Sequence, residues 1–234
     1  MSDRERAADE TVEHLPAGRG SEHLELSPLY AILDIDSLLR SAGARPEAEL
    51  LSSVLGFASD LAAGGVRLLQ YRAKQLPVRT ALSLARVLRQ KFPGVMLIMN
   101  DRADLCLAAG FDGVHVGQED LYPKDVRKLV GRRIVGVSTH NPEQIREAAA
   151  GPADYVAIGP VFATTSKSNT SPVVGLEGVR RARQLTTKPL VAIGGITLEN
   201  CRQVREAGAD SMAIISALLH EPRRAAEEIL RALG

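Results

Sequence analysis

Short apolar runs alternate with amphipathic segments along most of this chain. Between the apolar runs, stretches such as AELLSSVLGFASDLAAG and VRTALSLARVLRQKF carry apolar residues at helical spacing. Continuous apolar runs are typical of strands buried on both faces, and their alternation with helices indicates parallel crossover connections. The strand-like runs lie at residues 29–34, 66–71, 95–99, 113–116, 133–137, 155–159, 190–195 and 211–216.

Eight such strand–helix units in about 210 residues predict an α/β fold of the (β/α)8 TIM-barrel type. An open doubly wound sheet is disfavoured, because no GxGxxG turn follows the first strand-like run. Residues 1–27 are charged and sparsely apolar, and we expect them to be a disordered or loosely attached extension. The predicted organisation is therefore one barrel domain over residues 28–234, preceded by this extension.

The composition excludes several classes of protein. The 234 residues are 45% hydrophobic and 24% charged with a net charge of +1, which argues against a nucleic-acid or membrane-surface role. Only 3% of residues are aromatic, so a base-stacking platform is not expected. The sequence has no apolar run of membrane-spanning length, and we expect no secretory leader. Cys106 and Cys201 lie far apart in apolar segments and are expected to be buried thiols, which favours the cytoplasm.

In barrels of this type, the active site is built just beyond the carboxyl ends of the strands. After the second run, the alternation of side chains directs Gln70, Arg72 and Lys74 to one side. Asn100 and Asp101 follow the third run, and Asp120 follows the fourth. Each position also has a structural alternative. Arg72 and Lys74 could be a solvated pair, and Asn100-Asp101 and Asp120 could be helix N-caps.

His115 lies within the fourth run, where a core histidine with satisfied hydrogen bonds is the favoured interpretation over a ligand. Residues 160–172, PVFATTSKSNTSP, have the composition of a linker, yet they directly follow the sixth strand-like run. Their position suggests a loop that holds an anion through Lys167.

Together these positions predict two anion sites. Arg72, Lys74 and Lys167 supply cations beside the carboxylates of Asp101 and Asp120, a combination that suits a diphosphate bridged by Mg²⁺. A second site is expected near the ends of the last two strands, where barrels often bind a phosphate. Its predicted contributors are the backbone of Gly194-Gly195 and Ile215-Ser216 and the hydroxyls of Thr164 and Ser166.

From about Leu29 to its end, the chain resembles the thiamine-phosphate synthase family. The matching stretches, in order, are LLQYRAK, NDRADLCLAAGFDGVHVGQEDL, VGVSTH, ADYVAIGPVFATTSK and LVAIGGITLENCRQVREAGADSMAIIS. The resemblance implies a transferase of thiamine biosynthesis that joins 4-amino-2-methyl-5-(diphosphooxymethyl)pyrimidine to 4-methyl-5-(2-phosphooxyethyl)thiazole, giving thiamine phosphate and diphosphate. It also implies a dissociative mechanism assisted by Mg²⁺, with no protein nucleophile.

The resemblance carries roles to individual positions. It implies that the pyrimidine diphosphate is bound by Gln70, Arg72, Lys74, Asn100, Ser138 and Lys167, that Asp101 and Asp120 are the magnesium ligands, and that Thr164, Ser166, Gly195, Ile215 and Ser216 bind the thiazole phosphate. Arg72, Lys74, Ser138 and Lys167 are the expected catalytic residues. The usual Thr-x-Thr-Lys pattern reads Thr164-Thr165-Ser166-Lys167 here, which keeps the hydroxyl at residue 166 but loses a methyl group.

Two other functions remain open at this point. A related thiazole tautomerase would need a rim histidine for proton transfer and would not need the diphosphate and Mg²⁺ residues. A non-catalytic protein that binds thiamine phosphates would have little use for both the cations and the metal carboxylates. Fold-level analogy allows a monomer or a small homo-oligomer.

Overall fold

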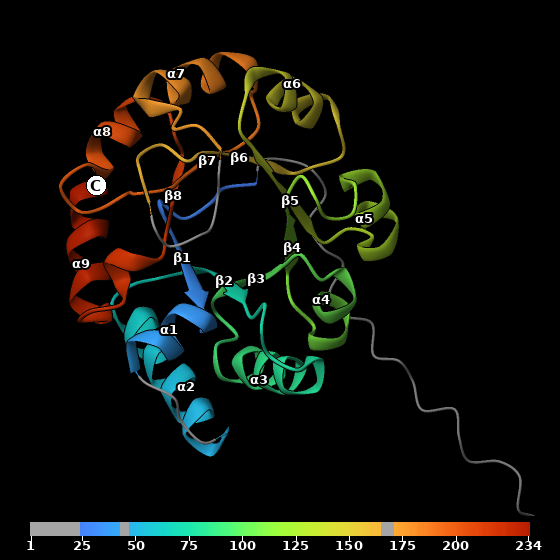
Figure 1. The fold of residues 1–234 in the computed structure, drawn as a ribbon, viewed down its shortest axis with the longest axis vertical. Helices are drawn as coiled ribbons and strands as arrows, with labels where there is room; N and C mark the ends of the chain where they lie inside the picture. Colours follow the sequence, from blue (N-terminus) through green and yellow to red (C-terminus); the bar gives the residue numbers. More distant parts are fainter. Residues whose placement is uncertain (1–23, 43–46, 165–170) are drawn as a thin grey trace, which may run out of the picture.

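The computed structural model describes residues 24–42, 47–164 and 171–234. Within them, eight parallel strands pair in sequence order, and the sheet closes because β8 pairs with β1 as well as with β7. Figure 1 looks down this barrel, with the strands in the middle and the helices around them. The strands are β1 (Leu29–Asp34), β2 (Leu68–Arg72), β3 (Met96–Asn100), β4 (Gly113–Val116), β5 (Ile134–Thr139), β6 (Tyr155–Ile158), β7 (Leu190–Ile193) and β8 (Ser211–Ile214).

Helices cover the outside of the barrel (Figure 1). They are α1 (Ile35–Ala42), α2 (Glu47–Ala63), α3 (Val78–Lys91), α4 (Ala103–Ala109), α5 (Pro123–Val130), α6 (Pro142–Ala150), α7 (Gly175–Leu185), α8 (Cys201–Glu206) and α9 (Pro222–Leu233), with a short 3-10 helix η1 (Ser216–Leu218) before α9. None of the helices in the described ranges combines the length and the apolar character needed to cross a membrane.

The closed eight-stranded barrel confirms the fold expected from the sequence. The predicted runs at 190–195 and 211–216 extend two residues too far, because β7 ends at Ile193 and β8 at Ile214. After β7, Gly194 and Gly195 have φ angles of 103° and 63°, which lie outside the strand region and favour glycine. Two helices, α1 and α2, lie between β1 and β2.

The domain boundary at residue 28 stays a prediction. Of the predicted extension, the structure describes only residues 24–27. Leu24 and Leu26 pack against the apolar cluster inside the barrel. The Ser27 carbonyl accepts a hydrogen bond from the Ser211 hydroxyl at 2.7 Å. These last residues before β1 therefore contact the barrel at the end where its strands begin.

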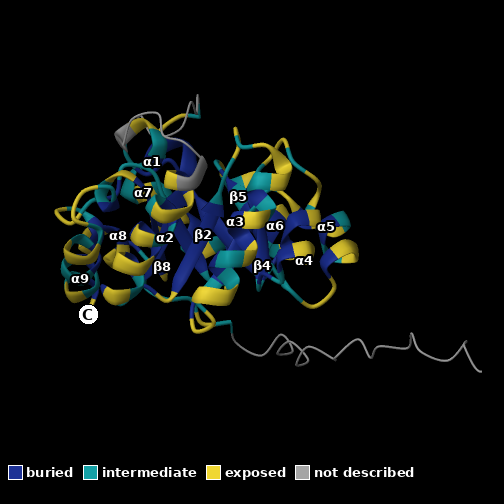
Figure 2. Cartoon of the chain, turned by 90° about the horizontal axis from the view of Figure 1, so that it is seen from below, coloured by how far each residue is buried: buried dark blue, intermediate teal, exposed yellow. Residues whose placement is uncertain are grey.

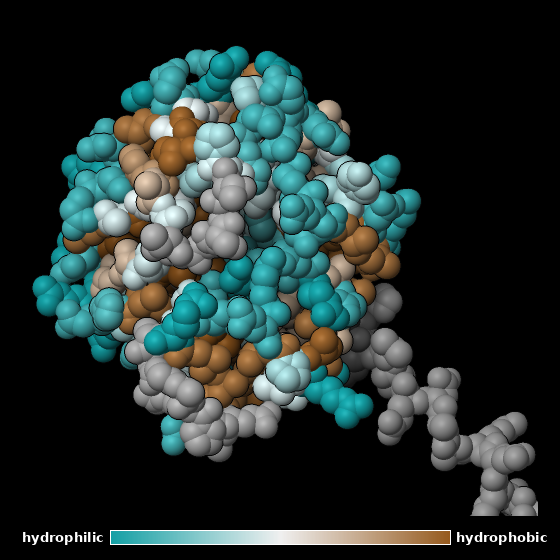
Figure 3. All heavy atoms as spheres, in the orientation of Figure 1, coloured by the Kyte–Doolittle hydropathy of each residue, from teal (hydrophilic) through white to brown (hydrophobic). Residues whose placement is uncertain are grey.

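The strands separate two apolar layers. Alternate residues of β1 illustrate this: Leu29, Ala31 and Leu33 pack outward under the helices, whereas Tyr30 and Ile32 belong to the cluster inside the barrel. Figure 2 shows the buried strands at the centre and exposed residues on the outer sides of the helices. Figure 3, in the orientation of Figure 1, shows hydrophilic residues over much of that face. The two cysteines, Cys106 and Cys201, are buried free thiols, as predicted.

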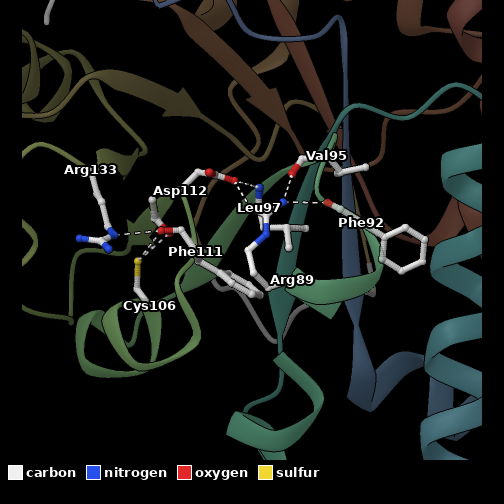
Figure 4. Close-up of polar contacts among 9 residues, drawn as sticks. Arg89, Phe92, Val95, Leu97, Cys106, Phe111, Asp112 and Arg133 are labelled. Carbon is white, nitrogen blue, oxygen red and sulfur yellow. Dashed lines mark hydrogen bonds and ion pairs between the residues drawn. The ribbon is translucent and has the colours of Figure 1, made fainter. Parts of the chain in front are cut away.

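Three equivalent arginine–aspartate clamps join the strands at the amino end of the barrel. In the first, drawn in Figure 4, Asp112 Oδ2 accepts hydrogen bonds from Arg89 Nη1 and from the Leu97 backbone N–H, both at 2.7 Å. Arg89 also donates to the carbonyls of Phe92 and Val95 in the loop that leads into β3. The clamp therefore ties the end of α3 to the start of β3 and β4.

The same arrangement recurs twice around the barrel. Asp154 bridges Arg127 and the Val135 N–H, and Asp210 bridges Arg183 and the Leu190 N–H. Each aspartate directly precedes an even-numbered strand, and each amide belongs to the preceding odd-numbered strand. Because these carboxylates satisfy both a guanidinium and a backbone donor, we assign them to stability, at the end of the barrel opposite the expected active site.

The clamp of Asp154 gives a test of this assignment. Its carboxylate is the least exposed of the three, at 31% against 41% and 49%. Asp154→Ala leaves Arg127 and the Val135 N–H without their acceptor, so we expect a loss of about 2 kcal/mol in the free energy of unfolding, measured in urea. Glu177→Ala removes the exposed ion pair with Arg180 and is the control, with an expected loss below about 0.5 kcal/mol. Equal losses in the two variants would contradict the assignment.

Candidate active site at the carboxyl ends of the strands

Two cations lie at the end of β2, and each pairs with a carboxylate. Arg72, the last residue of β2, donates to Asp34 at the end of β1 over 2.7 Å. The Arg72 side chain is 14% exposed and that of Asp34 is fully buried, so the interpretation of Arg72 as a solvated edge residue is wrong. Lys74 Nζ lies 3.0 Å from Asp101 Oδ2 and is half exposed.

Asp101 and Asp120 bring two carboxyl groups together beyond β3 and β4. Asp120 is near enough to Asp101 to shift the pKa of its carboxyl, and Asp120 Oδ2 accepts a hydrogen bond from the Gly117 N–H at 2.7 Å. Burial raises the pKa of Asp101, and the neighbouring Asp120 raises it further, while Lys74 opposes the shift. Asp101 has a φ of 61°, a strained value for a residue other than glycine. The structure therefore holds two carboxyls at a separation that disfavours ionisation of both.

The alternative in which these aspartates are helix N-caps is wrong. The N-cap residues of α4 and α5 are Arg102 and Tyr122, and within the described structure neither helix start has a side-chain cap hydrogen bond. Asp101 and Asp120 lie before these caps. Their carboxyls instead contact each other, Lys74 and the Gly117 amide.

The acidic pair has the composition of a magnesium site that is completed by a substrate. Among the described residues, no group of three or more His, Cys, Asp or Glu side chains is arranged to hold a metal ion. Mg²⁺ is commonly bound by one or two carboxylates together with phosphate oxygens and water. Two adjacent carboxyls, one of them with a raised pKa, fit that requirement, since a divalent cation would relieve their repulsion.

Inside the barrel, a line of polar side chains connects two of the predicted site residues. Gln70 Nε2 donates to Tyr30 Oη at 3.0 Å, and Tyr30 Oη lies 2.9 Å from Tyr155 Oη. His115 contacts Tyr155 Oη through Nδ1 and Ser138 Oγ through Nε2, both at 2.8 Å. His115 is thus a buried histidine with both ring nitrogens bonded, as the sequence favoured, but it also touches the predicted site residue Ser138.

Gln70 Oε1 is buried and makes no hydrogen bond within the described residues. A buried carbonyl oxygen without a hydrogen bond lowers the stability of the fold. In a binding site, a donor on the ligand commonly supplies the missing bond. The oxygen belongs to a residue predicted from the sequence to bind the pyrimidine. It is therefore the position in the barrel interior where a ligand N–H group fits best.

A pocket that opens to solvent lies at the ends of β7 and β8. A side chain at Gly195 would approach the Ala163 carbonyl oxygen to 2.6 Å, so the close contact between this turn and the loop after β6 requires glycine. The pocket includes five residues predicted for the second anion site, namely Thr164, Gly194, Gly195, Ile215 and Ser216. Its full lining is Thr164, Ile193, Gly194, Gly195, Ile196, Ala213, Ile214, Ile215 and Ser216.

The described site residues all belong to one end of the barrel. Asn100 is the last residue of β3 and is half-buried next to Asp101. Ser138 is near the end of β5. Ser166 and Lys167 lie outside the described residues. The structure places Gln70 inside the barrel. The other described site residues lie at or near the strand ends, and they are Arg72, Lys74, Asn100, Asp101, Asp120, Ser138, Thr164, Gly195, Ile215 and Ser216.

Three residues of the site were not predicted. Asp34 ends the first strand-like run, and its position there is the same signal that identified the residues after the second and third runs. Tyr30 and Tyr155 stand in the apolar runs LYAILD and YVAIG, where a hydroxyl is the only sign of a polar role. Burial raises the pKa of both phenols, so they stay protonated.

Comparison with known proteins identifies the family of this chain. Residues 45–218 match the family described as thiamine monophosphate synthase. The thiamine-phosphate synthase of Koribacter versatilis is 55% identical over 212 residues, which cover 90% of this chain and 97% of that protein. The thiamine-phosphate synthase of Chloroflexus aurantiacus is 43% identical over 173 residues, covering 73% of this chain and 80% of that protein.

A solved structure shows the same fold with related sequence. The thiamine phosphate pyrophosphorylase from Pyrococcus furiosus superposes with a TM-score of 0.76 at 32% identity, covering 88% of this chain and 95% of that one. Sequence matches over most of the chain and this structural similarity together assign the chain to one family. The chain belongs to the thiamine-phosphate synthase family of transferases.

Proposed function

We propose that this chain condenses 4-amino-2-methyl-5-(diphosphooxymethyl)pyrimidine with 4-methyl-5-(2-phosphooxyethyl)thiazole, releasing diphosphate and forming thiamine phosphate. The observation that carries the proposal is the rim at β2–β4, where Arg72 and Lys74 lie against the paired carboxyls of Asp101 and Asp120. Cations beside a magnesium-type acidic pair suit a diphosphate leaving group. The proposed compartment is the cytoplasm, which the two free thiols support.

The charge on this rim argues for a divalent cation. Arg72 and Lys74 are matched against three carboxylates, those of Asp34, Asp101 and Asp120. When all are ionised, these two cations and three carboxylates, counted over the described residues alone, leave one net negative charge, which repels a diphosphate. A divalent ion on Asp101 and Asp120 reverses the sign. Lys167, which lies outside the described residues, is proposed to add a further positive charge.

Asp101 and Asp120 are the residues proposed to hold Mg²⁺. When bound, Mg²⁺ supplies a concentrated positive charge that stabilises the oxygens of the leaving diphosphate. Arg72 is held by Asp34 with its side chain largely buried, so its guanidinium is pre-oriented at the rim. Lys74 is half exposed and can shift from Asp101 to a phosphate oxygen. These two side chains bind and neutralise the diphosphate.

The proposed reaction is dissociative. The C–O bond between the pyrimidine methylene and the diphosphate breaks first, and the bonding electron pair leaves with the diphosphate. The resulting pyrimidinylmethyl cation is stabilised by electron donation from its ring amino group, and the thiazole nitrogen then forms the new C–N bond. The site needs placement and charge stabilisation for this reaction and does not need a protein nucleophile.

Residues inside and at the rim of the barrel are suited to bind the two substrates for this reaction. Gln70 Oε1 is a buried acceptor without a partner among the described residues, and it suits the amino group of the pyrimidine. Asn100 is proposed to bind the same substrate, and Ser138 to donate a hydrogen bond to the departing diphosphate. The pocket of Thr164, Gly195, Ile215 and Ser216 is proposed to hold the thiazole phosphate, with Ser166 as a further hydroxyl.

The reaction itself is the first test. Purified protein mixed with both substrates and Mg²⁺ is expected to release diphosphate and form thiamine phosphate in equal amounts. Omission of the thiazole phosphate should stop thiamine phosphate formation. Chelation by EDTA should stop turnover, and excess Mg²⁺ should restore it, because the rim without metal lacks the positive charge that stabilises the leaving diphosphate. Absence of diphosphate release, or release that is unchanged in EDTA, would overturn the proposal.

Asp101→Asn tests the acidic pair. The substitution removes one proposed metal ligand, so turnover at saturating substrate should fall about 100-fold or more. Stability should be unchanged or higher, because the variant relieves the repulsion from Asp120 and asparagine tolerates a positive φ. The measurements are steady-state rates and the thermal midpoint.

Asp104→Asn provides the matched control for that variant. Asp104 lies three residues after Asp101, on the first turn of α4. It is exposed and forms an ion pair with Arg102. Its turnover is expected to equal that of the unmodified protein. If Asp101→Asn retained the full rate, Asp101 would be removed from the metal site.

A further inference from the structure

We infer that Tyr30, Tyr155 and His115 are positioning residues. Through their hydrogen bonds, they hold Gln70 as an acceptor and Ser138 as a donor toward a ligand. The inference rests on the proposed function, since it concerns how two residues of that site are held. The five side chains come from β1, β2, β4, β5 and β6 and meet inside the barrel. They therefore connect opposite sides of the lumen through four hydrogen bonds.

These groups are shielded from water, so their protons must be shared among themselves. Tyr30, Gln70 and Tyr155 are 1%, 2% and 0% exposed, and His115 is 9% exposed. A buried hydroxyl that failed to donate would carry a large desolvation penalty. Burial raises the pKa of both tyrosines, so each phenol contributes one proton.

The bond between Gln70 and Tyr30 fixes the direction of the other hydrogen bonds. Gln70 Nε2 can only donate, so Tyr30 Oη accepts from it. Among the described residues, the remaining partner of Tyr30 is Tyr155 Oη, and Tyr30 must therefore donate its proton to Tyr155. Tyr155 in turn donates to His115 Nδ1. Any other assignment with this amide orientation leaves the Tyr30 proton unbonded in the core.

The order of donors then determines the tautomer of His115 and whether the Ser138 hydroxyl proton is available to a ligand. Because His115 Nδ1 accepts, the ring proton is on Nε2, which donates to Ser138 Oγ. Ser138 accepts that bond and keeps its own O–H for a ligand. At the other end, Gln70 Oε1 remains an acceptor without a partner in the described structure. One end presents an acceptor and the other a donor.

The two ends cannot change independently. Reversing the Gln70 amide would reverse every bond in the line, because each hydroxyl and the imidazole carry one shared proton. Ser138 would then donate to His115 and lose the proton it offers to a ligand. The observed order meets both needs of the proposed reaction, an acceptor for the pyrimidine amino group and a donor for the leaving diphosphate. A pyrimidine with an oxo group in place of the amino group would favour the reversed order of hydrogen bonds. Ser138 would then no longer donate to the leaving diphosphate.

A second observation shows that the sheet makes room for Tyr155. Gly136 on β5 is the register partner of Tyr155 on β6. A Cβ at Gly136 would lie 2.0 Å from Tyr155 Cζ and 2.3 Å from its hydroxyl oxygen. The ring of His115 stacks on that of Tyr155, with centroids 5.5 Å apart. The phenol is therefore held from two sides with its hydroxyl between Tyr30 and His115.

The tautomer of His115 tests the inference without any substrate. In the ligand-free protein, ¹⁵N NMR of the imidazole should show the neutral form protonated at Nε2, with its signal identified by its loss in His115→Gln. Tyr155→Phe removes the donor to Nδ1 and should populate the other tautomer. Tyr71→Phe is the matched control, because Tyr71 is also a buried tyrosine but bonds the Ala81 carbonyl outside the lumen. A ring protonated at Nδ1 in the unmodified protein would overturn the inference.

Kinetics test the coupling to Ser138. Tyr155→Phe should lower kcat about tenfold, while Tyr71→Phe leaves kcat unchanged at a similar thermal midpoint. In a Ser138→Ala background, Tyr155→Phe should lower kcat less than about twofold, because the residue through which it acts is gone. Equal effects in both backgrounds would show a merely structural role and refute the positioning role. If the unmodified protein released no diphosphate, the proposed function would fail, while the tautomer would still decide the order of the hydrogen bonds.

Discussion

The pairing of β8 with β1 is the contact on which the site depends. Tyr30 and Ala31 of β1 lie opposite Ala213 and Ile214 of β8, and this register closes the parallel sheet. Because every strand then runs in the same direction around one axis, all carboxyl ends meet on one rim. Residues as distant in the chain as Asp34 and Ser216 contribute to the same surface for this reason.

The two ends of the barrel differ in how their charges are balanced. At the amino end, each carboxylate of the three clamps is matched by an arginine and a backbone amide, so no charge is left over. At the carboxyl end, Asp101 and Asp120 face each other, burial raises the pKa of Asp101, and its backbone is strained. The stabilising interactions at one end offset an arrangement at the other that is unfavourable until a ligand arrives.

The lumen of the barrel is more polar than the packed interior typical of small barrels. Five hydrogen-bonding side chains replace part of the apolar filling formed by residues such as Ile32, Leu68 and Val191. This is tolerated because every internal link is hydrogen-bonded. Among the described residues, the one buried side-chain nitrogen or oxygen without a hydrogen-bond partner is Gln70 Oε1, the atom proposed to bind the substrate. A polar interior of this kind favours one arrangement of protons, which an apolar core cannot do.

The sequence by itself determined the barrel, the strand positions and most of the rim, because burial on both faces and the alternation of side chains are local properties of the chain. It therefore placed Arg72 and Asp101 at the ends of strand-like runs, but it missed Asp34 as the partner of Arg72. It also gave no reason to connect Tyr30 with Tyr155, which are 125 residues apart in the chain. Only the tertiary structure decided those pairings, because which inward side chains meet across the lumen depends on the register and closure of the whole sheet.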